Sequence, residues 1–99
     1  MAKFQILCWQ DIPSVVEARE GREIHKIQLS QKFQELIDLV AMRKGMGDSD
    51  AYLEQWAKRP AELRDGGAKA VAEAVAGEIE ADYEAIRNAQ LATLRQAAG

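Results

Sequence analysis

Cys8 and His25 carry the side chains that nucleophilic catalysis would need. They are the only cysteine and the only histidine of the chain, so a thiolate attack helped by an imidazole base would have to use this pair. The two could meet only if the strands that carry them paired. Cys8, however, alternates with Phe4 and Ile6, and a buried thiol behaves as a small hydrophobic side chain. We expect a core role for Cys8 and an ordinary strand position for His25, so the sequence predicts no catalytic residue.

A second candidate for chemistry is a run of carboxylates near the C-terminus that a hard metal ion or an acid–base pair could use. One helix cannot bring alternate positions together at one point, so a solvated acidic face is the expected reading. With one cysteine and one histidine, an internal disulfide is excluded and a common structural zinc site is not expected. The sequence predicts no metal and no cofactor. The carboxylates are Glu78, Glu80, Asp82 and Glu84.

Three strands are predicted at the start of the chain, at about 3–9, 15–19 and 24–29, as an antiparallel meander. Pro13 lacks a backbone N–H, so pairing is expected to stop there. Glu20 and Gly21 form the predicted second turn, because glycine takes a positive φ without steric cost. His25, Ile27 and Leu29 share one face of the third strand. Such a sheet needs a cover on its apolar face.

Three helices are predicted to follow, at about 30–44, 49–59 and 68–96. Ser30 is the expected N-cap of the first, Asp48 or Ser49 caps the second, and Pro60 ends it. Residues 61–67 are a charged, glycine-containing loop. The third helix, roughly 40 Å at 1.5 Å per residue, is longer than a small sheet can cover, so part of it is expected to project or to contact another chain. The prediction is a single α+β domain over 1–99.

The long helix has two distinct stripes. One is apolar and is the expected core face, and the other consists of small residues that would let a second helix approach closely. Two explanations stay open for the small residues: alanine is the best helix former, or they form a helix–helix contact. Gly77 slightly favours a contact, because glycine weakens a helix. The apolar stripe is Val71, Val75, Ile79, Tyr83, Ile86 and Leu94; the small-residue stripe is Ala70, Ala74, Gly77, Ala81, Ala85, Asn88 and Ala92.

Trp9 lies at the Pro13 corner, with Arg19 and Arg22 beyond it, and tryptophan and arginine often anchor protein interfaces. Trp9 either packs under the first helix or is an exposed anchor beside the Pro13 corner. Tyr52 and Trp56 are a satellite cluster or a second anchor. The interaction candidates in these two regions are Trp9, Asp11, Pro13, Arg19, Arg22, Tyr52 and Trp56.

The net charge of −3 and the scattered Lys and Arg residues predict no nucleic-acid surface. No stretch reaches the roughly 20 apolar residues that span a bilayer, and the N-terminus lacks a signal-peptide pattern. A single cysteine fits a reducing compartment. We therefore expect a cytoplasmic protein with no membrane partner.

The chain resembles a family of small bacterial proteins described as virulence factors. The residues that carry this resemblance are WQDIP at 9–13, VEAR at 16–19, KIQLS at 26–30, Phe33, Ile37, Asp38, Ala41, Met42 and DAYLEQW at 50–56. It covers most of residues 3–90 and implies no catalytic residue. It implies an association with folate- and corrinoid-dependent one-carbon enzymes. Cys8 stands where relatives are expected to have an aromatic residue.

Two functions are predicted from these observations. The first is a non-enzymatic accessory protein that contacts a protein partner or a second copy through the 9–22 region and the small-residue stripe. The alternative is a small-molecule-binding protein or enzyme subunit, with a pocket between the sheet and the first helix lined by Trp9, Arg19 and His25.

Overall fold

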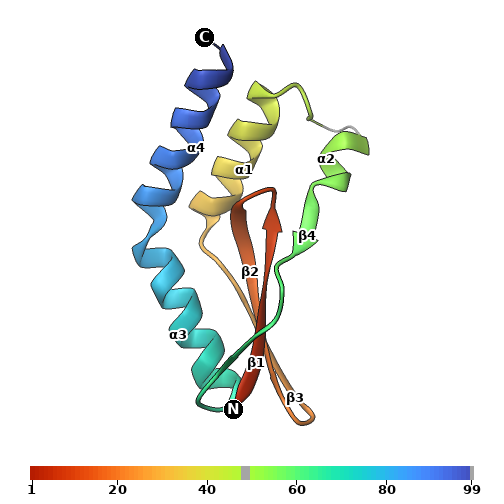
Figure 1. The fold of residues 1–99 in the computed structure, drawn as a ribbon, viewed down its shortest axis with the longest axis vertical. Coiled ribbons are helices and arrows are strands. Elements are labelled where there is room, and N and C mark those ends of the chain that lie inside the picture. Colours follow the sequence, from red (N-terminus) through yellow and green to blue (C-terminus); the bar gives the residue numbers. More distant parts are fainter. Residues whose placement is uncertain (48–49, 99) are drawn as a thin grey trace.

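The computed structural model describes residues 1–47 and 50–98, and it confirms the α+β class. An antiparallel sheet is followed and covered by helices (Figure 1). In chain order the elements are β1 (Ala2–Trp9), β2 (Ile12–Glu20), β3 (Glu23–Gln28), α1 (Gln31–Arg43), α2 (Asp50–Glu54), β4 (Trp56–Lys58), β5 (Glu62–Arg64), α3 (Ala68–Ala81) and α4 (Tyr83–Ala98).

The predicted meander is confirmed as the β3-β2-β1 part of the sheet. The β2–β3 turn is at Gly21 and Arg22, where Gly21 has a φ of 59°. The β1–β2 turn is at Gln10 and Asp11, and Gln10 also has a positive φ, of 52°. As predicted, His25, Ile27 and Leu29 lie on the more buried face.

Pro13 does not stop strand pairing, contrary to expectation. It lies in β2 opposite Cys8, while Val15 lies opposite Leu7, so Ser14 is one extra residue in a β-bulge. The Ser14 carbonyl accepts a hydrogen bond from the backbone N–H of Leu29 at 2.9 Å. The bulge accommodates a residue without an N–H inside the sheet, so β2 begins at Ile12 rather than at residue 15.

The predicted helix over 49–59 is wrong in its second half. α2 ends at Glu54, and the next residues form β4, which pairs with β1. The predicted loop over 61–67 contains β5, which pairs with the start of β1. Pro60 lies between these two short strands. The proposed caps of α2, Asp48 and Ser49, lie outside the described residues.

The predicted helix over 68–96 is divided at Asp82, whose φ and ψ are −92° and 3°. Contacts from α1 explain the position of the break. Glu80 accepts hydrogen bonds from the backbone N–H and the hydroxyl of Ser30, both at 2.7 Å, so that hydroxyl does not cap α1 as expected. Tyr83 packs edge-on against Phe33, with ring centroids 5.0 Å apart. The break directs α3 along the sheet and α4 alongside α1 (Figure 1).

The core lies between the sheet and the helices. α3 packs on β2 and β3, and α1 packs against β2. None of the described helices is long and apolar enough to cross a membrane. The largest fully buried side chains are Trp9, Phe33, Ile12, Ile37, Val16, Val40, Val71, Pro13 and Cys8.

Candidate functional site

Cys8 and His25 do not form a catalytic pair. β2 lies between their strands, and His25 is in register with Ala18 and Phe4 rather than with Cys8. The Cys8 residue is 2% exposed. Burial raises the pKa of its thiol, and the positive charge of Arg59 only partly opposes this. A neutral, covered thiol is a poor nucleophile, so the placement of Cys8 agrees with the expected core role.

Trp9 is a core residue rather than an exposed anchor. Its side chain has no accessible surface, and its indole N–H donates a hydrogen bond to the Tyr52 carbonyl oxygen at 2.9 Å. The rings of Trp9 and Tyr52 lie 5.6 Å apart, and those of Tyr52 and Trp56 lie 6.3 Å apart. The three aromatic residues form one cluster that attaches α2 to β1 and β4 of the sheet. Pro13 is also buried, so neither it nor Trp9 is an exposed anchor.

The remaining candidates of the 9–22 region are exposed, but they do not form one surface. Asp11 and Arg22 lie in the turns at opposite ends of β2, whose nine residues separate them by roughly 30 Å. Arg19 and His25 point to opposite faces of the sheet, and Trp9 is buried at the far end of the hairpin. The expected pocket lined by Trp9, Arg19 and His25 is therefore not formed.

Arg19 belongs to a group of charges on the open face of the sheet. The Glu17 carboxylate lies 3.4 Å from the Arg19 guanidinium and 3.6 Å from each ammonium of Lys26 and Lys58. Partial burial would raise the pKa of Glu17, but Lys58, Lys26 and Arg19 together lower it. The ion pairs of Glu17 with Lys26 and Lys58 link β2 to β3 and β4.

Replacement of Glu17 by glutamine should destabilise the protein at neutral pH by about 1 kcal/mol or less, because water screens the three exposed cations. Since the pKa of Glu17 is lower in the folded state, its contribution is complete above the unfolded-state pKa and is lost as the pH falls through the folded-state pKa. Urea unfolding of wild type and Glu17→Gln should therefore differ at pH 7 and converge in strong acid. A constant difference across that range would contradict this assignment.

The C-terminal carboxylates separate, as expected for one helix. Glu78 accepts two hydrogen bonds from the Arg64 guanidinium, at 3.0 and 2.5 Å, and these lower the pKa of Glu78. Glu80 binds Ser30 and lies 3.9 Å from the Lys32 ammonium. Among the described residues, no three His, Cys, Asp or Glu side chains are placed to hold a metal ion.

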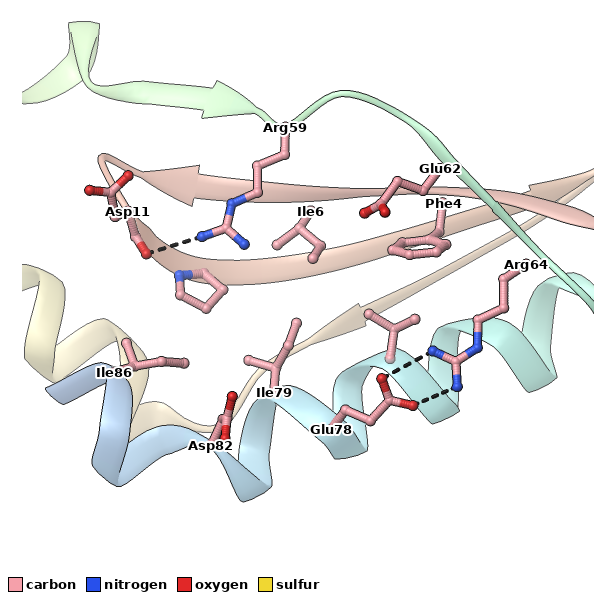
Figure 2. A pocket seen from close by; sticks show the side chains of 12 residues that line it. Phe4, Ile6, Asp11, Arg59, Glu62, Arg64, Glu78, Ile79, Asp82 and Ile86 are labelled. Carbon is pink, nitrogen blue, oxygen red and sulfur yellow. Dashed lines mark hydrogen bonds and ion pairs between the residues drawn. The ribbon is translucent and has the colours of Figure 1, made fainter. Parts of the chain in front are cut away.

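A groove of about 490 Å³ lies between β1, the connection from β4 to β5, and the α3–α4 break (Figure 2). Arg59 lies at one end and donates a hydrogen bond to the Asp11 carbonyl oxygen at 3.2 Å. The Arg64–Glu78 ion pair closes the other end. The lining comprises Phe4, Ile6, Asp11, Pro13, Arg59, Glu62, Arg64, Val75, Glu78, Ile79, Asp82 and Ile86.

Sequence reasoning missed Arg59, Glu62 and Arg64 as groove residues. They lie in or beside two strands of three residues each, which have too few alternations to be recognised by pattern. The only local signal was the density of charge between Lys58 and Asp65.

The second candidate surface is the outer face of α3 and the start of α4, away from the sheet. The small residues expected there are exposed, so the core does not use them. A Cβ atom added to Gly77 would meet nothing within 4 Å. We call this the outer face; it comprises Ala70, Ala74, Gly77, Ala81 and Ala85.

Comparison with known proteins places the chain in a family. The model of the family described as "Virulence factor" matches residues 7–94, most of the chain. No curated protein and no solved structure matches.

Proposed function

The chain belongs to the virulence factor family, and from this premise we propose that it is a non-enzymatic accessory protein that acts by contact with a helix of another protein. Its described residues bring no thiol and base together, and they hold no metal-binding cluster. The outer face of α3 and α4 is the proposed contact surface.

Gly77 is the observation that carries this proposal. A glycine inside a helix costs roughly 0.5–1 kcal/mol relative to alanine. Positive φ values are found at Gly21, Gly45 and Gly66 but not at Gly77, and the space around its Cα is open. The fold therefore gains nothing from this glycine. Close approach of a second backbone at this point would explain it, as at other helix contacts made by small residues.

Charge indicates what kind of helix fits the outer face. On a helical projection, the exposed Glu73 and Glu84 flank the small residues on one side, and Glu78, on the other side, is paired with Arg64. A second copy would bring like charges together, which is unfavourable. A partner helix that carries Lys or Arg beside its own small residues fits better. Folate- and corrinoid-dependent one-carbon enzymes, which the family resemblance suggested, are the first partners to test.

Substitution of Gly77 separates stability from binding. Gly77→Ala should raise the free energy of unfolding by about 0.5–1 kcal/mol. Gly77→Leu should keep the protein folded, since leucine is a strong helix former, but should weaken partner binding by about tenfold or more because it fills the contact. Binding is measured by titration of a partner that co-purifies with the tagged wild-type chain.

Glu35→Leu places the same side chain on an exposed position of α1 and is the matched control. It should leave partner binding unchanged. A chain that stays monomeric and alone, or a partner that binds Gly77→Leu as tightly as wild type, would refute the proposal. If the wild-type chain self-associates and Gly77→Leu does not, the partner at the outer face is a second copy of this chain rather than a basic helix.

A further inference from the structure

The groove of Figure 2 is a cavity that the outer-face contact does not use. Its volume of about 490 Å³ lies within the range of roughly 300–1,000 Å³ that ligand pockets occupy. Ile6 and Val75 are almost fully buried beneath it, and Phe4, Ile79 and Ile86 are partly buried. The floor is thus apolar and incompletely covered by the chain's own side chains.

The fold keeps this groove open by holding its two longest side chains at the ends. The Arg59 guanidinium is directed toward the Asp11 carbonyl oxygen, and the Arg64 guanidinium is paired with Glu78 (Figure 2). The break at Asp82 turns α4 toward α1, and the groove lies at this bend, between the helices and β1. A ligand could therefore reach Phe4 and Ile79 without breaking a hydrogen bond.

The charge of the lining selects the ligand. The lining contains two arginines and four carboxylates, which leaves a net charge of −2. Glu78 is neutralised by Arg64. Asp11, Glu62 and Asp82 are exposed and form no ion pair with any residue that the structure describes. These three carboxylates exceed the single remaining guanidinium, of Arg59, so a cation is attracted and an anion is not.

The cation that fits is organic rather than metallic. The described carboxylates do not cluster as metal ligands do, and an apolar floor offers nothing to a hydrated ion. We propose that the groove binds a small organic cation: a protonated primary amine on an apolar body about the size of one aromatic ring. The body rests on Phe4, Ile6 and Ile79, and the ammonium faces Asp82 and Glu62.

The probe is 2-phenylethylamine, titrated into the full chain and followed by NMR chemical shifts. We expect saturable binding in the millimolar range, with the largest shifts at Phe4, Ile6 and Ile79. The neutral isostere 2-phenylethanol and the anion 3-phenylpropionate share the apolar body and should bind at least about fivefold more weakly. Binding of the amine should also weaken with added salt.

The double substitution Glu62→Gln and Asp82→Asn should lower amine affinity by about fivefold or more. The control Glu73→Gln removes a carboxylate that lies beside the outer face and outside the groove lining, and it should leave amine affinity unchanged. Both substitutions are at exposed positions, so folding is retained and is checked by thermal unfolding. The proposal is overturned if the alcohol or the anion binds as well as the amine, if groove shifts are absent at about 10 mM probe, or if the double variant binds normally. If an acetylated, amidated Phe-Lys dipeptide binds more tightly than the amine, the ligand of the groove is a peptide and the small-amine proposal is overturned.

This inference does not depend on the proposed function, because the two surfaces are tested by different variants. Gly77→Leu should leave amine binding intact, and the Glu62→Gln, Asp82→Asn variant should leave capture of the helical partner intact.

Discussion

Replacement of Trp9 by alanine should lower the free energy of unfolding by about 3–5 kcal/mol, the largest effect expected of a single substitution in this protein. The side chain is the largest that is fully buried, and it lies where β1 meets α2 and β4. Domains of this size are stable by roughly 5–15 kcal/mol, so a measurable unfolded fraction is expected at 25 °C. Urea unfolding followed by far-UV circular dichroism measures the effect.

Two matched variants divide the effect of Trp9 into its parts. Trp9→Phe keeps an aromatic ring but removes the indole N–H that binds the Tyr52 carbonyl at 2.9 Å, and should cost about 1–2 kcal/mol. Trp56→Ala removes the same side chain type from a half-buried position and should also cost about 1–2 kcal/mol. If Trp56→Ala were as damaging as Trp9→Ala, the core position assigned to Trp9 would be wrong.

The elements with clear periodicity were predictable from the sequence. Phe4, Ile6 and Cys8 alternate along β1, Gly21 marks the second turn, and Phe33 begins the apolar stripe of α1. Each of these signals is local: it depends on side-chain spacing or on a backbone conformation that one residue type favours. The meander and the first helix therefore agree with the structure to within three residues at each end.

The elements that arise only from tertiary contact were not predictable. β4 and β5 are strands because β1 offers them backbone partners, as in the hydrogen bond from the Arg59 N–H to the Ile6 carbonyl at 2.9 Å. The break at Asp82 falls at two weak helix formers, Asp82 and Tyr83, inside a run of strong ones, but low propensity alone does not end a helix. The tertiary contribution comes from Ser30 and Phe33, each 50 residues before its partner, which contact Glu80 and Tyr83 on the two sides of the break.

The groove was likewise not predictable from the sequence, because it depends on tertiary contacts. Its ionisable residues come from the first turn, from β5 and the residue after β4, and from the last turn of α3 and the break that follows it. Asp11 and Asp82 were singled out from the sequence, but for other roles, and Arg59 and Arg64 were not. Only the pairing of β4 and β5 with β1 places these residues around one cavity.

Phe33→Ala should give the second-largest loss of stability, about 3–5 kcal/mol, and should release α4 from α1. Phe33 is 1% exposed and meets Tyr83 edge-on at an interplanar angle of 80°, at the point where α3 passes into α4. Lys32, its neighbour, lies 4.7 Å from the centre of the same tyrosine ring. Loss of the phenyl ring leaves a cavity at the α3–α4 junction. It also removes the ring contact that holds Tyr83, at the start of α4, against α1.

Amide hydrogen exchange distinguishes this loss from a uniform one. In Phe33→Ala, protection should fall more in α4 than in α3, because α3 keeps its own contacts with β2 and β3 while α4 depends on α1. Met42→Ala on the same helix removes a side chain that is 74% exposed and should change stability by no more than about 0.5 kcal/mol. Equal loss of protection in α3 and α4 would show that the two helices act as one rod and that the break at Asp82 does not separate them.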